Sequence, residues 1–177
     1  MSYYLYGCSE VYTFNCQDCP SPDNGRVRAM WLRSVNYQWT NIQNPAEWAS
    51  AIAAGNVIII PYTSGELQET AKTEDGFGDL AEMFVTYEIT AEIDLPYNPN
   101  NDAFWNEKKN SLKWVVGYVT QNHMMELSVP AMLVPTHPVT KDKETMLRDH
   151  VQVKAVQSVY MQRLPRVANI FNDCAMT

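Results

Sequence analysis

The segment Val85–Leu95 alternates without a break between apolar and polar residues. Its odd-numbered positions are all apolar and its even-numbered positions are all polar. This period of two fits a β-strand, whereas a helix, at about 100° per residue, would scatter the apolar side chains around its axis. The 11 residues, at about 3.4 Å each, would span roughly 37 Å, about twice an ordinary strand. The pattern predicts one long strand with one face for the core and one for water or a polar cavity.

A helix is predicted where the sequence N-P-A-E-W-A-S-A-I-A-A-G begins at Asn44. Asn44 is a favourable N-cap, and Glu47 stands where it completes a capping box. Gly55 suits the C-terminal end of a helix. Trp48 and Ile52, four residues apart, predict a narrow apolar stripe that docks one side of the helix on a sheet.

The remaining elements are shorter. Strands are expected at 26–33, at 57–60 (as a segment buried on both faces), as a hairpin of 114–120 with 125–134, and at 150–160, and a short helix at 103–111. Residues 62–84 show turn formers and no strand period, so we expect a loop. Together these elements predict a mainly β (α+β) fold, an antiparallel β-sandwich or barrel with one or two flanking helices.

The length of 177 residues suits one domain with an extended arm. We divide it into an N-terminal arm (1–24), a β domain (25–164) and a C-terminal tail (165–177). No run of about 18 apolar residues occurs, so no membrane span is expected. The first residues show no signal peptide, which indicates synthesis in the cytoplasm.

The distribution of charge is uneven. The net charge of −7 argues against nucleic-acid binding through a basic groove. Residues 61–100 contain nine acidic residues and one basic residue, whereas 141–166 contain six basic and three acidic ones. A solvated loop and one polar sheet face would explain the acidic stretch, and ordinary surface variation would explain the contrast. Alternatively, the two regions match each other in a head-to-tail stack of copies.

The residues that carry chemistry form no catalytic pattern. The three histidines stand outside any metal or nucleophile motif, and no phosphate-binding glycine loop occurs. We therefore expect a non-enzymatic protein without a cofactor. Four cysteines, Cys8, Cys16, Cys19 and Cys174, are candidate metal ligands. Cys16 and Cys19 form one C-x-x-C, but a turn follows it and a second pair is lacking, so reduced structural cysteines are the other interpretation.

The order of these elements resembles virion structural proteins of tailed phages. The resemblance rests on the helix N-P-A-E-W-A-S-A-I-A-A-G, then V-I-I-I-P, E-D-G-F-G, V-T-Y-E-I-T-A-E-I, F-W-N, W-V-V-G-Y-V-T and V-Q-V-K-A. It covers roughly residues 25–160. It is nearest to the tail-tube-like proteins of phages of gut Bacteroidetes, including the crAss-like group.

The resemblance implies a subunit that assembles with copies of itself into a ring, with six-fold symmetry as one option, and with other virion proteins. Its location would be the virion. Glu88, Glu92 and Asp94 would line a lumen through which DNA passes as cargo, because an acidic wall repels phosphates. A loop carrying Glu66, Glu69, Glu74, Asp75 and Asp79 would bridge to the next subunit. Head–tail joining and capsid-decorating proteins share this style, so these roles stay open, as does a small cysteine-metal binding domain.

Overall fold

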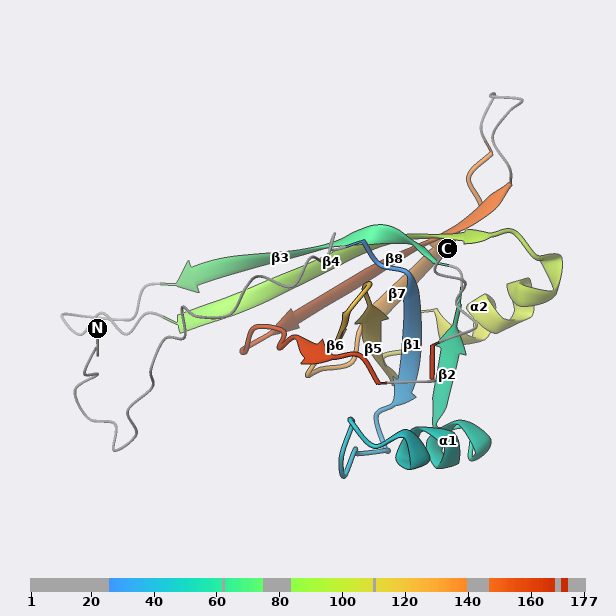
Figure 1. The fold of residues 1–177 in the computed structure, drawn as a ribbon. Helices are drawn as coiled ribbons and strands as arrows, with labels where there is room; N and C mark the ends of the chain where they lie inside the picture. Colours follow the sequence, from blue (N-terminus) through green and yellow to red (C-terminus); the bar gives the residue numbers. More distant parts are fainter. Residues whose placement is uncertain are drawn as a thin grey trace, which may run out of the picture.

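The computed structural model describes residues 26–61, 63–74, 84–109, 111–139, 147–167 and 170–171. Within these ranges the chain forms two antiparallel β-sheets that share a core, together with two short α-helices (Figure 1). The predicted mainly β fold with flanking helices is confirmed, as a sandwich of two open sheets and not as a closed barrel. The N-terminal arm (1–24) lies outside the described residues.

The five-stranded sheet has the order β2-β1-β5-β6-β9. Its strands are β1 (Ala29–Ser34), β2 (Val57–Ile60), β5 (Trp114–Val119), β6 (His123–Glu126) and β9 (Leu164–Pro165). β2 is an edge strand, and its three isoleucines, Ile58, Ile59 and Ile60, are only partly buried. The prediction that 57–60 is buried on both faces is therefore wrong for three of its four residues. Because β2 has a neighbouring strand on one side only, its apolar side chains are not fully covered.

The four-stranded sheet has the order β3-β4-β8-β7. Its strands are β3 (Ser64–Glu74), β4 (Phe84–Pro96), β7 (Met132–Thr136) and β8 (Arg148–Gln157). β4 contains the whole predicted strand 85–95, and Ile89, Ala91 and Ile93 on its inner face are buried. The alternating pattern is thus confirmed at its centre.

β3 is a strand of 11 residues that pairs with β4 along its length, so the prediction of a loop over 62–84 is wrong for 64–74. Among the described residues, β8 pairs with β4 from Tyr87 onward, and the hairpin of β3 and β4 projects past the body (Figure 1). Leu67 packs on the core, but Glu69 and Thr73 on the same face are exposed. Because a strand face without a covering layer need not be apolar, β3 shows no hydrophobic period.

Two hydrophobic clusters lie on opposite faces of the five-stranded sheet. The first fills the space between the sheets and includes Met30 and Leu32 of β1 and Ile93 of β4. The second lies between the other face of that sheet and the first helix, where Trp31 packs with Trp48. β1 therefore sends alternate side chains into both clusters and connects them.

The second cluster is aromatic. The ring of Trp31 lies 5.2 Å from that of Trp48 and 5.8 Å from that of Phe171, measured between centroids. Gly117 faces Trp31 in the register, and a Cβ there would lie 2.0 Å from the indole, so only glycine fits. Phe171 is fully buried. The C-terminal segment from 165, predicted to lack assignable structure, thus packs on the domain at this residue.

The helix α1 (Pro45–Ala53) begins and ends where the sequence predicts. The Asn44 side chain accepts a hydrogen bond from the N–H of Ala46 at 3.1 Å, as an N-cap does. Gly55 has φ +72°, the left-handed conformation that glycine adopts without strain.

Two details of α1 differ from the prediction. The carboxylate of Glu47 accepts from the backbone N–H groups of Thr40 and Asn41, at 2.6 and 2.7 Å, so it closes the preceding turn instead of a capping box. The buried stripe consists of Trp48 and Ala51, while Ile52 is 38% exposed. The helix thus packs on the sheet through one large and one small side chain, and Ile52 lies at the edge of this contact.

The predicted second strand of the hairpin, 125–134, is divided between the sheets. β6 ends at Glu126 in one sheet and β7 begins at Met132 in the other. The chain between them stays attached to β5, because Leu127 N–H donates to Val116 O and Ala131 N–H donates to Trp114 O, both at 2.9 Å. A proline at position 130 cannot donate in a ladder, which explains the break. The short helix is confirmed as α2 (Asp102–Lys108), preceded by a 3-10 turn, η1 (Pro99–Asn101).

A buried ion pair links three segments of the five-stranded sheet region. The guanidinium of Arg33 contacts Glu126 Oε1 at 2.9 Å, and these side chains are 7% and 12% exposed. The other carboxylate oxygen accepts from the indole N–H groups of Trp31 and Trp39, at 2.9 and 3.0 Å. Both oxygens of Glu126 are thus hydrogen-bonded, as a buried charge requires.

Candidate functional site

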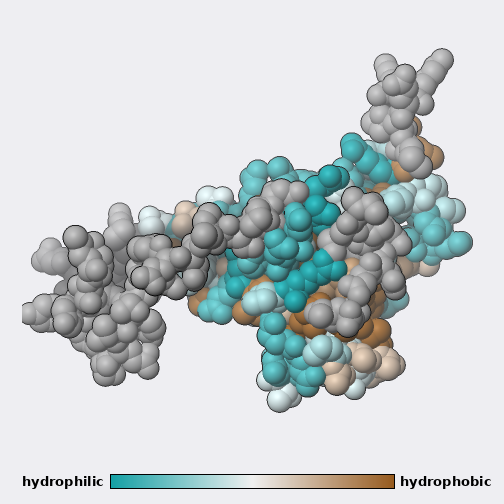
Figure 2. Space-filling view, viewed as in Figure 1, coloured by the Kyte–Doolittle hydropathy of each residue, from teal (hydrophilic) through white to brown (hydrophobic). Residues whose placement is uncertain are grey.

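The outer face of the four-stranded sheet points away from the core and carries mainly polar side chains. Its side chains are Ser64, Glu66, Gln68, Thr70 and Lys72 of β3, Thr86, Glu88, Thr90, Glu92 and Asp94 of β4, Arg148, His150, Gln152, Lys154 and Val156 of β8, and Met132, Val134 and Thr136 of β7. In Figure 2 hydrophilic residues follow the upper edge of the body, where Figure 1 places this sheet, and hydrophobic ones appear near β2.

The outer face is close to neutral, not acidic. Among the side chains described on it, four are carboxylates and three are Lys or Arg. The net charge is therefore −1 with His150 neutral and zero with His150 protonated. The acidic count over 61–100 missed this balance, because the cations come from β8, which is distant in sequence.

His150 lies between two carboxylates of β4. Its Nδ1 is 2.9 Å from Asp94 Oδ1 and its Nε2 is 2.5 Å from Glu92 Oε2. A neutral imidazole has one N–H donor, so two carboxylate acceptors favour the doubly protonated ring. Partial burial lowers the pKa of His150, but the hydrogen bonds and charges of Asp94 and Glu92 outweigh this, and the net pKa is raised above 6.5.

The second oxygens of Asp94 and Glu92 also accept hydrogen bonds, and the third carboxylate of β4, that of Glu88, is paired as well. Arg148 Nη1 donates to Asp94 Oδ2 at 3.0 Å, and the amide of Gln152 donates to Glu92 Oε1 at 2.5 Å. Further out on the hairpin, Lys72 pairs with Glu88, with side chains 55% and 42% exposed. These are cross-strand pairs, which stabilise one register of a sheet.

The structure brings the three predicted lumen residues, Glu88, Glu92 and Asp94, to one face of β4. Sequence analysis missed their partners. The signal was present in β8, where Arg148, His150, Gln152 and Lys154 are the polar members of an alternating strand. The role of the three carboxylates as a lining stays a prediction.

The predicted contact loop is not a loop where it is described. Glu66, Glu69 and Glu74 lie on β3, whereas Asp75 and Asp79 lie outside the described residues. Glu66 is on the outer face, opposite Glu92. Glu69 is on the inner face, where its carboxylate accepts from Met161 N–H at 2.8 Å. Glu66 and Glu69 thus face different neighbours.

β3 exposes a long strand edge. Val27 N–H donates to Gly65 O at 3.1 Å on the side away from β4, so the backbone groups of Gly65 point outward. Because a ladder alternates, the N–H and C=O groups of Leu67, Glu69, Ala71 and Thr73 point outward as well. Within the described residues, no strand pairs with this edge beyond Val27. Such an edge is a template for another strand.

The opposite edge, β7, is shorter and partly blocked. Tyr97 N–H donates to Leu147 O, and the alternation from this bond places the backbone of Leu133 and Pro135 on the free side of β7. Proline has no N–H, so the edge offers few donors. Exposed apolar side chains, Met132 and Val156, lie on the outer face nearby, at 42% and 58% exposure.

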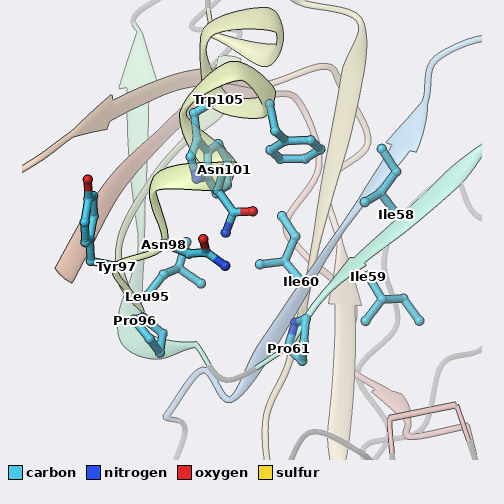
Figure 3. Close-up of a pocket in the computed structure, with 11 residues that line it drawn as sticks. Ile58, Ile59, Ile60, Pro61, Leu95, Pro96, Tyr97, Asn98, Asn101 and Trp105 are labelled. Atoms are coloured by element: carbon cyan, nitrogen blue, oxygen red, sulfur yellow. The ribbon is translucent and has the colours of Figure 1, made fainter. Parts of the chain in front are cut away.

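A pocket of about 400 Å³ lies between β2 and the segment that joins β4 to α2 (Figure 3). One wall is Ile58, Ile59, Ile60 and Pro61, and the other is Leu95, Pro96, Tyr97, Asn98, Asn101, Phe104 and Trp105. Trp105 is 3% exposed, and its indole N–H has no hydrogen-bond partner among the described residues. The pocket is apolar, with a few polar groups at one end.

A His–Asp arrangement lies near this pocket. His137 Nδ1 is 2.9 Å from Asp149 Oδ1, and its Nε2 is 3.6 Å from Asp102 Oδ1. The ring of Tyr97 packs edge-on against His137. Within the described ranges, no group of three or more His, Cys, Asp or Glu is arranged to hold a metal. The four cysteines lie outside those ranges.

No protein-family model matches the chain, and no curated protein matches it significantly. Within the described residues, no helix is long and apolar enough to cross a membrane. The function must therefore be argued from the surfaces of the fold.

Proposed function

We propose that this chain is a non-enzymatic structural protein of a phage virion that self-assembles into rings or a tube of the tail or neck. The observation that supports the proposal is the projecting β3–β4 hairpin with its open edge. Beyond the end of β8 the hairpin is two-stranded, at 84–86 with 72–74, and a two-stranded ribbon is marginally stable alone. A long open strand edge invites pairing with another chain. A neighbouring copy that covers this hairpin would supply both the missing layer and the missing strand.

The outer face suits a surface past which DNA moves. Two of its three Lys and Arg side chains are engaged with carboxylates of the same face, Arg148 with Asp94 and Lys72 with Glu88. DNA phosphates bind where Lys and Arg neutralise them, so cations that are already paired with carboxylates should bind DNA weakly. In this proposal Glu88, Glu92 and Asp94 prevent sticking chiefly by occupying the cations of the sheet, and repulsion from a uniformly acidic wall is not required.

The two unlike edges of the four-stranded sheet favour a ring over a symmetric pair of copies. The open edge of β3 and the short edge of β7 differ in length and chemistry, and they lie on opposite sides of one sheet. Contact between two different surfaces repeats head to tail, and it closes into a ring when the rotation permits. A capsid-decorating or head–tail joining role would use the same edges in another symmetry.

The assembly state of the purified full-length chain tests the proposal. Sedimentation velocity and negative-stain microscopy should show discrete rings or short tubes. A stable trimer would favour capsid decoration, and a two-fold dimer would indicate pairing of β3 with β3. A monomer across the accessible concentration range would contradict self-assembly. Metal analysis of the same sample addresses the remaining alternative, because stoichiometric zinc would favour a cysteine-metal domain.

A further inference from the structure

The edge of the five-stranded sheet at β2 carries a second set of outward backbone groups. Ser34 N–H donates to Asn56 O at 2.8 Å, so Ser34 and Asn56 form a hydrogen-bonded pair of the ladder with β1. By alternation Ile58 and Ile60 also bond to β1, and the N–H and C=O of Ile59 point away from it. In the described part of the chain, no strand pairs with this side of β2.

The pocket next to this edge has the features of a peptide groove. Strand addition uses main-chain hydrogen bonds for affinity and side-chain pockets for specificity. The outward N–H and C=O of Ile59 can form the main-chain hydrogen bonds, and the apolar pocket of about 400 Å³ can receive a side chain (Figure 3). Trp105 lines the pocket, and its indole N–H is buried without a partner among the described residues.

The segment before Arg26 is the part of the chain that fits. Residues 1–19 contain no proline, lysine or arginine, and include Tyr, Leu, Val and Phe, which favour strands. At about 3.3 Å per residue, 24 extended residues reach up to about 80 Å. This length is sufficient to reach another molecule.

The direction in which the chain enters the domain points to another copy. Val27 forms an antiparallel bridge with Gly65, so the chain before Val27 is directed the way β3 leaves the body. Figure 1 shows that β3 runs away from β2 and α2. A segment that reaches the pocket of the same molecule would have to reverse this direction, whereas a copy placed beside the hairpin could present its pocket without such a reversal.

We propose that residues 1–24 of a neighbouring copy dock as an added strand on the free edge of β2. The backbone of this segment pairs with the outward N–H and C=O of Ile59, and one of its apolar side chains enters the pocket. The inference rests on the proposed self-assembly and names a contact that links adjacent copies independently of the β3 edge.

Photo-crosslinking in the full-length chain tests this contact. A benzoylphenylalanine is placed at Tyr4, and labelled (¹⁵N) and unlabelled copies are mixed before irradiation. Mass spectrometry should find crosslinks from this position to residues 57–61 or 95–105, with one labelled and one unlabelled partner. The same photoreactive residue at Val156, which is 58% exposed on the outer face, should not reach 57–61.

Two variants at one position link the crosslink to the strand edge. Ile59→Pro removes the outward N–H and leaves the bonds of Ile58 and Ile60 to β1, so the crosslink yield should fall about tenfold. Ile59→Val keeps the N–H and should retain the yield. Equal yields for the two variants, crosslinks confined to one copy, or crosslinks elsewhere would overturn the inference.

The C-terminal residues provide the remaining check. If a photoreactive residue at Met176 labels 57–61 in place of one at Tyr4, the C-terminal segment occupies the groove and the inference fails.

Sedimentation of the same samples distinguishes a failure of the docking from a failure of the proposed function. Rings without the crosslink leave self-assembly standing and refute the docking, whereas the crosslink in a sample without rings supports the docking and refutes the ring.

Discussion

The two sheets of the sandwich use their faces differently. The five-stranded sheet is covered on both faces, by the shared core on one side and by α1 with Phe171 on the other. The four-stranded sheet is covered on one face, and its other face is polar and open. Both sheets contribute to the shared core, but among the described residues only the first sheet buries side chains on both of its faces. Polar substitutions on the exposed face of the second sheet should therefore cost less stability than substitutions within the first sheet.

The largest effect is expected from breaking the buried ion pair of the five-stranded sheet. Glu126→Ala leaves the charge of Arg33, whose side chain is 7% exposed, without its partner. It also removes the acceptor of two indole N–H groups. We expect the free energy of unfolding to fall by about 3–5 kcal/mol in urea denaturation. Glu88→Ala on the open sheet is the control, with a loss below about 1 kcal/mol. Similar losses for the two variants would contradict the contrast between the sheets.

An intermediate effect, dependent on pH, is expected on the open face. The pKa of His150 is raised in the folded chain, so its contribution is fully present below the unfolded pKa of about 6.5 and is lost as pH rises through the folded pKa. His150→Gln should therefore reduce the free energy of unfolding by up to about 1 kcal/mol near pH 6, and by less near pH 9. Urea denaturation of both proteins across this range measures the difference. A difference that does not change with pH would show that the imidazolium contributes nothing.

The smallest effect is expected on the projecting hairpin. Lys72→Ala removes a pair whose side chains are 55% and 42% exposed. Exposed pairs contribute little, so the free energy of unfolding should change by less than about 0.5 kcal/mol. A loss comparable with that of Glu126→Ala would show that the hairpin belongs to the cooperative core, and the comparison between the sheets would then need revision.

The sequence predicts the elements whose pattern is produced by burial. β4 alternates because one face meets the core, and α1 is delimited by Asn44 and Gly55. β3 escaped prediction because much of its inner face is uncovered. The division of 125–134 between two sheets was not predicted either, because a local pattern does not show which sheet a strand joins.

Half of the candidate site could be predicted from the sequence. The carboxylates of β4 were predicted to share a face because they lie close together on one alternating strand. Their partners His150 and Arg148 were not assigned, because cross-strand pairing across more than 50 residues depends on sheet order. The free edges of β2 and β3 could not be predicted either, since an edge is defined by which strands are neighbours.

If the open edge of β3 joins copies, blocking one of its outward N–H groups should prevent assembly, and a pair of variants at Ala71 measures this effect. Ala71→Pro removes an outward N–H without breaking the ladder to β4, whereas Ala71→Val keeps it. Sedimentation velocity of both should show rings for Ala71→Val and their loss for Ala71→Pro, with the same unfolding midpoint. Rings of equal amount in both variants would contradict the claim.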